Sequence, residues 1–481
     1  MGIKSNFIYS SLLTVSSFLF PMLTYPYVSR VLGVTNIGVC NFVDSIINYF
    51  ILFSSMGINV VGIREIAKAK GDTLRVSKVF SSLWILEAGM TAIMLFLLLI
   101  ATVFISQLNE YASLIMIGAC KLIANLFLIE WFYRGIEEFK YITYRSLIVK
   151  VLYVVCIFIF IHQPSDYPVY YTLSVLLVVF NAVFNIFYSR RFVGFVLDRD
   201  VIDEFKRPFF ILGLYAMLTS MYTSFNVAFL GFVTSVTEVG YYTTATKLHS
   251  IILAFFSAFT GVMLPRISIL VEENRMDKVK YLTEKSFNLL FMTSIPLIIF
   301  SIYFAPEIIY FISGCGYEGA ITPMRMVMPL VLIIGLEQIL IIQLLMPLRN
   351  DKAIFINSII GAIVGIIANV IFVPIWAAKG SAIVWLLAEI SVLLSASYFL
   401  HKQIDFHVSI HKVVFTLCAS LVYWGGCWGI DFISGDTIEA ICFSMVIFIF
   451  LFGILNFKFL QSLNFHKRNV YLVSSQKLAH N

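Results

Sequence analysis

Charged side chains are scarce in this sequence: lysine, arginine, aspartate and glutamate make up only 12% of its 481 residues, whereas 60% are hydrophobic. A soluble domain carries about 25% charged and about 45–50% apolar residues. The mean hydropathy of +0.93 points the same way. A water-soluble fold is therefore excluded, and we expect an integral membrane protein.

Features that catalysis or metal binding would need are missing as well. No connecting stretch is long enough to fold as a soluble domain. There are seven cysteines, and all except Cys315 fall inside apolar segments, which argues against a disulfide framework. The sequence contains no glycine-rich phosphate loop, nucleophile elbow or zinc signature. We therefore expect no enzymatic activity, no cofactor and no metal site.

What the sequence does contain is a series of apolar segments long enough to cross a bilayer. We count about fourteen and predict an all-α membrane protein with that many transmembrane helices. The predicted spans lie near 7–28, 37–60, 79–105, 111–132, 146–162, 169–189, 208–232, 239–263, 286–312, 324–347, 353–374, 380–400, 413–433 and 438–460.

Lysine and arginine are confined almost entirely to alternate connections between these spans. The stretches 61–78, 134–150, 190–207 and 266–285 are rich in them, whereas the intervening loops hold almost none. The positive-inside rule then places both termini of this multi-pass membrane protein in the cytoplasm. We interpret the net charge of +6 as topology and contact with membrane lipids, and we expect no nucleic-acid partner.

A faint internal repeat relates the two parts of the chain. "RVLGVTNIGVCNF" at 30–42 follows the first predicted span, and "AFLGFVTSVTEVGYYTTA" at 228–245 follows the seventh. We predict two pseudo-symmetric six-helix lobes related by an axis along the membrane normal, with a substrate site between them. The expected divisions are an N-lobe over 1–207, a C-lobe over 208–400, and two C-terminal helices with a cytoplasmic tail over 401–481.

The eighth predicted span carries a lysine deep within it. Lys247 lies about 12 Å from the expected membrane boundary, which is farther than a lysine stem readily snorkels. It belongs to a stripe of polar and small residues on one helix face. Similar stripes include Asp44 on the second span and Lys121 with Asn125 on the fourth. Hydroxyl residues alone often only join helices.

Intramembrane charges are harder to explain by packing alone. Lys121, Lys247, Glu337 and Glu389 each lie near the middle of a predicted span. Insertion of such a group costs about 2.5–3.5 kcal/mol, so each must be paired inside the protein or face water. Two interpretations remain open: a partly cationic polar cavity between the lobes, or purely structural ion pairs.

Several segments resemble the Wzx-type polysaccharide flippases, which belong to the MATE-like MOP transporter superfamily. The resemblance covers about residues 1–400 and depends on the order and spacing of several segments. The similar segments are "FPMLTYPYVSRVLGVTNIGVCNFVDSIINYFILFSSMGINVVGIREIAK", "IEWFYRGIEEFKYITYRS", "AFLGFVTSVTEVGYYTTATKL…GVMLPRIS" and "AIVGIIANVIFVPIWAAKGSAIVWLLAE".

The resemblance implies alternating access and transfer of an undecaprenyl-diphosphate-linked oligosaccharide across the bacterial cytoplasmic membrane, for O-antigen or other surface polysaccharide. On this hypothesis Lys121, Lys247 and Arg30 attract the diphosphate. The polar stripes, including Asn125 and Asn226, bind the sugars. Other polysaccharide-assembly proteins are left open as partners.

One position departs from the family pattern. Relatives carry aspartate where this chain has Asn226, so an acid that could bind a coupling ion is absent there. Glu389, Glu337 and Asp44 are the candidates to replace it, and H⁺ and Na⁺ both stay open as the ion.

Three alternatives remain. A MATE-type small-molecule antiporter would need an acidic cavity for cationic substrates. A lipid II flippase shares the "SRVLG" segment. A membrane glycan polymerase or ligase, from a different functional class, would need a large outer loop that this chain lacks.

Overall fold

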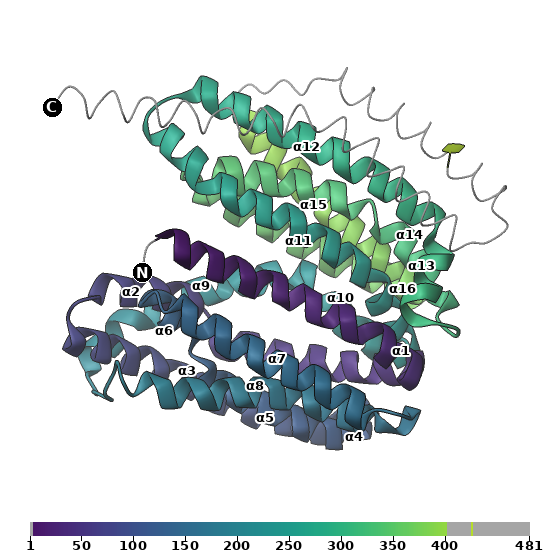
Figure 1. Ribbon diagram of the computed structural model, residues 1–481, viewed down its shortest axis with the longest axis horizontal. Helices are drawn as coiled ribbons and strands as arrows, with labels where there is room; N and C mark the ends of the chain where they lie inside the picture. The colour runs from purple at the N-terminus through teal and green to yellow at the C-terminus, as the bar shows by residue number, and fades with distance from the viewer. Residues whose placement is uncertain (1–2, 402–424, 427–481) are drawn as a thin grey trace. The chain divides into compact units, whose positions relative to one another are not determined.

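The computed structural model describes residues 3–401 together with 425 and 426 (Figure 1). The predicted spans at 413–433 and 438–460 and the tail lie outside the described residues, apart from 425 and 426. The described part is helical throughout and contains no strand. Its α-helices are α1 (Ile3–Ser55), α2 (Ile58–Ala69), α3 (Thr73–Phe104), α4 (Ser106–Glu110), α5 (Ala112–Leu128), α6 (Glu130–Gly135), α7 (Phe139–Phe160), α8 (Tyr167–Ser189), α9 (Arg199–Thr223), α10 (Phe225–Val233), α11 (Val236–Glu272), α12 (Met276–Tyr303), α13 (Ala305–Ser313), α14 (Ile321–Val327), α15 (Leu330–Gln338) and α16 (Asp351–His401).

Two of these helices are too long to be single spans. As one rod, the 53 residues of α1 would measure about 80 Å, against about 30 Å for the hydrocarbon core. The helix breaks at Gly33, whose φ of 76° glycine adopts without strain. α16 breaks in the same way at Ala377 (φ 47°, ψ −123°), three residues after Pro374. Each helix therefore supplies two spans.

The described residues hold the first twelve predicted spans. Nine helices are long and apolar enough to cross a membrane, α1 and α16 among them. The bent pair α9 and α10, which meet at 58°, forms one more span. The tenth predicted span combines α14, α15 and a π-helix at Ile339–Leu345. The prediction of an all-α, multi-pass membrane protein is confirmed.

The chain packs as two compact units. Of the described residues, the first comprises 3–254, Ile309–Val327 and Asp351–Ser395, and the second comprises Phe255–Ile308, Met328–Asn350 and 396–401 with 425 and 426. In the first unit, α1, α3, α5, α7 and α8 lie side by side (Figure 1). In the second, α12 packs against α15 so closely that a Cβ on Gly335 would lie 2.4 Å from Leu290.

Polar residues fix where the helices of the first unit begin. Asp72 caps α3 by accepting hydrogen bonds from the backbone of Leu74 and Arg75, both at 3.0 Å. Asp198 caps α9 and forms an ion pair with Lys78 at 2.9 Å. The hydrogen bond from Lys78 holds the pKa of Asp198 below its usual value. These contacts stabilise the connections at one end of the bundle.

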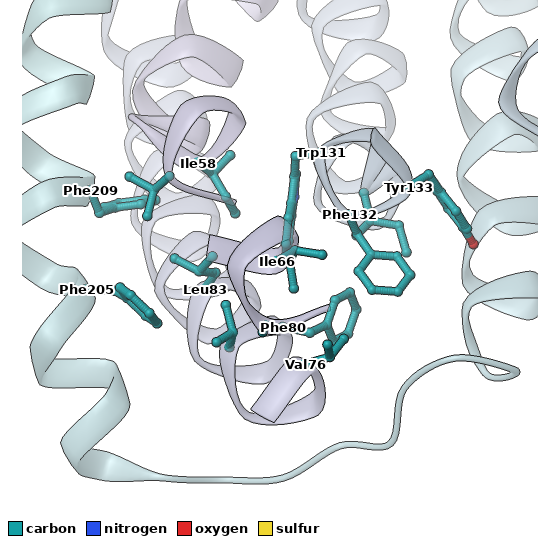
Figure 2. Packing of buried hydrophobic residues seen from close by; sticks show 14 of the residues in the cluster. Ile58, Ile66, Val76, Phe80, Leu83, Trp131, Phe132, Tyr133, Phe205 and Phe209 are labelled. Atoms are coloured by element: carbon teal, nitrogen blue, oxygen red, sulfur yellow. The ribbon is translucent and has the colours of Figure 1, made fainter. Parts of the chain in front are cut away.

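A hydrophobic cluster joins the short helices α2 and α6 to α3 and α9 (Figure 2). Trp131 of α6 is stacked on Phe80 of α3, with 5.7 Å between ring centroids. Trp131 also lies against Gly62 of α2, where a Cβ would come within 2.4 Å of its ring. The cluster fixes α2 and α6 at the end of the bundle, close to two of the cavities described below.

Candidate functional site

The polar stripe on the second half of α1 faces α5, as shown by Lys121. The Lys121 ammonium lies 2.6 Å from Asp44 Oδ1 and 3.1 Å from Asn48 Oδ1. Asn48 in turn donates to Asp44 Oδ2 at 2.9 Å. The side chains of Lys121 and Asp44 remain 16% and 34% exposed. This is a solvated charge pair at the edge of a cavity.

The cavity next to this pair measures about 430 Å³. Most of its lining residues are polar, and they come from the four helices α1, α9, α10 and α11. α1 supplies Asn41, Asp44, Ser45, Asn48, Tyr49 and Leu52; α9 and α10 with the residue between them supply Ser220, Ser224 and Val227; and α11 supplies Thr243. Such a lining offers both donors and acceptors. It can hold a hydroxyl-rich ligand.

Lys247 of α11 lies over the ring of Tyr25, 4.8 Å from its centroid, and is half-buried. A cation in this position is attracted by the ring face. The Tyr25 hydroxyl is held by Thr244 at 2.6 Å, which fixes the ring under the lysine. Among the described residues no carboxylate lies within 4.0 Å of Lys247, although the charge of Asp44 acts on it. Lys121, Lys247 and Asp44 together therefore carry one excess positive charge.

Equivalent positions of the internal repeat face each other where α1 meets α11. The Thr35 and Thr237 hydroxyls lie 3.0 Å apart, and Asn41 donates to Thr243 at 2.9 Å. Both pairs are 202 residues apart in the sequence.

Two glycines allow this crossing. A Cβ on Gly38 would lie 1.7 Å from the Val236 carbonyl oxygen, and one on Gly240 would lie 2.3 Å from that of Val34. The two contacts are reciprocal: Gly38 meets Val236, Gly240 meets Val34, and 202 residues separate the two glycines as well as the two valines. The backbones of α1 and α11 therefore touch directly at this crossing, which we call the glycine seam.

Asn125 lies one turn from Lys121 but faces a different cavity of about 300 Å³. Its amide donates to Ser55 at 2.8 Å and to Glu87 at 3.5 Å. Glu87 of α3 is only 2% exposed inside the bundle. It was not among the residues that the sequence singled out.

Arg30 and Asn226 make contacts of other kinds. The Arg30 guanidinium donates to the Phe311 carbonyl at 2.5 Å and is exposed. Asn226 is 1% exposed, and its amide is bonded to Asn369 at 2.7 Å and to the Ser381 carbonyl at 3.3 Å. Neither residue lines the 430 Å³ cavity.

The remaining predicted acids lie on α16 and α15. Glu389 is 3% exposed and accepts a hydrogen bond from Trp385 at 2.9 Å. Glu337 is half-buried on α15 in the second unit. In the part of the chain that the structure describes, no three histidine, cysteine or acidic side chains come together as a metal site would require.

Residues 3–271, more than half of the chain, match the family described as "Polysaccharide biosynthesis protein". The chain belongs to this polysaccharide biosynthesis protein family. Two relatives carry the name "Putative O-antigen transporter". The one from Escherichia coli (strain K12) is 26% identical over 78% of this chain and 90% of its own length. The one from Shigella dysenteriae is 23% identical over 81% and 98%.

Solved structures show the fold of this polysaccharide biosynthesis protein. The lipid II flippase MurJ in an inward closed conformation aligns with a TM-score of 0.78 over 95% of this chain and 99% of MurJ, at 16% identity. An inward-facing multidrug resistance MATE transporter of the MOP superfamily aligns at 0.62 over 80% and 94%, at 17% identity. The predicted resemblance to the Wzx-type polysaccharide flippases is thus confirmed by the family match and by the fold.

Proposed function

We propose that this protein moves an undecaprenyl-diphosphate-linked oligosaccharide from the cytoplasmic to the outer leaflet by alternating access. Its family and the names of its two curated relatives support transport of a surface polysaccharide precursor. The observation that carries the finer proposal is the 430 Å³ cavity, whose lining includes Asp44, together with the excess positive charge that Lys121 and Lys247 give the group they form with Asp44.

The diphosphate explains that charge. A diphosphate that leaves the headgroup layer must exchange its hydration for fixed cationic and polar partners. Lys247 has an aromatic contact in place of a carboxylate, so its charge is available to an anion. Lys121 would exchange Asp44 for phosphate or share both. Arg30 would act as an outer contact.

The sugars would bind to the amides and hydroxyls of the cavity lining, such as Asn41, Asn48 and Thr243. Asn125 would extend this surface along α5. Asn226 would reach substrate only in a state that breaks its bonds to Asn369 and Ser381. The polyprenyl chain would stay in the lipid.

Alternating access requires a contact between helices that closes one side of the substrate cavity and can later separate. With both termini in the cytoplasm, the glycine seam lies at the outer end of the lobes 1–207 and 208–400. We propose that it closes the outer side while the cavity receives substrate, and that it opens when the lobes rock about the repeat axis. The coupling ion would act through a carboxyl group, for which Asp44, Glu337 and Glu389 were the sequence candidates.

The test is complementation of a strain that lacks its own O-antigen transporter and makes a matching repeat unit. The wild-type chain should restore surface polysaccharide, and Lys247→Ala should lower it at least about tenfold because a charged contact to phosphate is lost. Lipid-linked repeat units should then accumulate in the inner leaflet. Lys247→Arg should retain more activity than the alanine variant.

The matched control is Lys285→Ala. Lys285 also lies over a tyrosine ring, 4.4 Å from the Tyr281 centroid, but it belongs to the second unit. Equal export from K247A and wild type would refute the cationic site. Rescue of cells depleted of their lipid II flippase, without restored surface polysaccharide, would assign the protein to lipid II instead.

A further inference from the structure

The carboxyl group of Glu87 is the most isolated acid that the structure describes in the first unit. It is 2% exposed. Oε1 accepts hydrogen bonds from Ser55 at 3.4 Å and Asn125 at 3.5 Å, whereas Oε2 has no hydrogen-bond partner in the described residues. The side chain lines the 300 Å³ cavity. It is thus a buried acid with an unused oxygen next to a polar space.

In the described part of the chain, no cation forms an ion pair with this acid. Among the charged groups near α3, only Glu130 and Arg134 line the same cavity. They pair with each other at 3.4 Å, and Glu130 also binds Arg145 at 3.1 Å. Lys121 on α5 is held by Asp44. The other charged groups on elements that contact α3 do not line this cavity: Arg30 on α1; Arg64, Glu65 and Lys68 on α2; Glu110 on α4; and Arg199, Asp200, Asp203, Glu204, Lys206 and Arg207 on α9.

An ionised carboxylate in such a place is strongly disfavoured, because burial removes its hydration and no opposite charge replaces it. A neutral carboxyl group bears no such penalty. The cavity also gives the proton a route, since about 30 Å³ per water leaves room for several molecules beside Ser55 and Asn59. The site can therefore both hold a proton and exchange it.

We propose that Glu87 is the proton-carrying group that couples flipping to H⁺ movement. This inference rests on the proposed function and adds a residue that the sequence did not single out for this role. The proton binds to a carboxylate oxygen of Glu87 in the structure described above. It leaves to water when the cavity opens.

Glu87 is linked to the substrate cavity through the polar side chains where α1 meets α5. Asn125, which contacts Glu87, is one turn from Lys121, which contacts Asp44 and Asn48. A deprotonated Glu87 would draw the donors of Ser55 and Asn125 toward itself. This shift would move α1 and α5 relative to each other at the turn that positions Lys121.

The donors around Glu87 favour a proton over Na⁺. The Asn125 amide presents Nδ2, not its oxygen, to both Ser55 and Glu87. A metal cation needs several oxygen ligands, whereas a carboxyl group that cycles between neutral and ionised forms needs donors only in the ionised form.

The experiment compares wild type, Glu87→Gln and Glu110→Gln as full chains in proteoliposomes. Glu110 is an exposed acid on α4, next to α3, and serves as the matched control. The transport probe is a fluorescent polyprenyl-diphosphate-linked sugar, followed with and without a pH gradient. We expect the gradient to raise transfer several-fold in wild type and E110Q but to leave E87Q unchanged at its gradient-free rate.

A second measurement does not depend on transport. Infrared difference spectra between high and low pH should show a protonated buried carboxyl band in wild type and E110Q that is missing in E87Q. If wild type fails to move the probe, the proposed function fails while the band still tests Glu87. Absence of the band, a gradient response in E87Q equal to wild type, or stimulation by a Na⁺ gradient instead would each overturn the assignment.

Discussion

Asp44 accepts one hydrogen bond with each of its carboxylate oxygens, from Lys121 and from Asn48. It therefore has two roles in the cavity: it holds the lysine in place and it cancels one positive charge. The first role favours the binding of a substrate anion to Lys121, whereas the second weakens it. Mutation can separate the two effects.

We predict that Lys121→Ala weakens binding of a polyprenyl-diphosphate probe about tenfold, whereas Asp44→Ala leaves it equal or tighter because the cavity becomes more positive. Both changes should destabilise the protein by about 1–2 kcal/mol, between the values for exposed and buried pairs. Probe binding and thermal unfolding in detergent measure the two effects.

Lys206→Ala is the control, because its pair with Asp203 is exposed on both sides. It should change neither quantity. Weaker binding in D44A as well as K121A would show that Asp44 does no more than position the lysine.

At the scale of single residues, the sequence located charges but not their partners. Lys121 and Lys247 stood out because each interrupts an apolar run, and the stripe on α1 put Asp44 on the correct face. Which acid meets which lysine depends on how the helices are rotated about their axes. One sequence carries no signal for that rotation, and Glu87 was missed for the same reason.

At the scale of helices, the glycine seam depends on the absence of a Cβ. We predict that Gly38→Ala destabilises the protein by about 1–3 kcal/mol and removes most export, because its methyl group would lie 1.7 Å from the Val236 oxygen. Thermal unfolding and surface polysaccharide report both effects.

Gly89→Ala is the matched control in an exposed part of α3, where nothing lies within 4 Å of the added Cβ. It should be neutral or slightly stabilising, since alanine has the higher helix propensity. Wild-type behaviour of G38A would mean that α1 and α11 do not need to meet so closely.

Helix positions were predictable where apolar length decides them. The first twelve spans and the breaks at Gly33 and Ala377 follow from runs of apolar residues with a short polar or glycine-containing interruption. The helices α2 and α6 were not predicted. Each begins inside the end of a predicted span, 37–60 or 111–132, and continues past it, and its position follows from contacts such as Trp131 with Gly62 rather than from hydropathy.

At the scale of the whole molecule, the proposed mechanism requires the two repeats to separate at the glycine seam. We predict that a Thr35→Cys/Thr237→Cys pair forms a disulfide, because the native hydroxyls lie 3.0 Å apart. The cross-linked protein should lose nearly all export, and reduction should restore it. The seven native cysteines are first replaced by serine to remove competing thiols.

Each single cysteine variant is the control and should export at the wild-type rate under oxidising conditions. Sustained export by the fully cross-linked protein would show that α1 and α11 stay together throughout the cycle. The mechanism would then need a different opening.

The backbone contact at the glycine seam also bears on the speed of the cycle. Two helices that meet without interlocking side chains uncover little apolar surface when they separate, so the hydrophobic penalty for parting is small. The hydroxyl and amide bonds that break there can be remade with water. Opening such a contact needs little free energy, which suits the proposed carrier because it must open and close in every transport cycle.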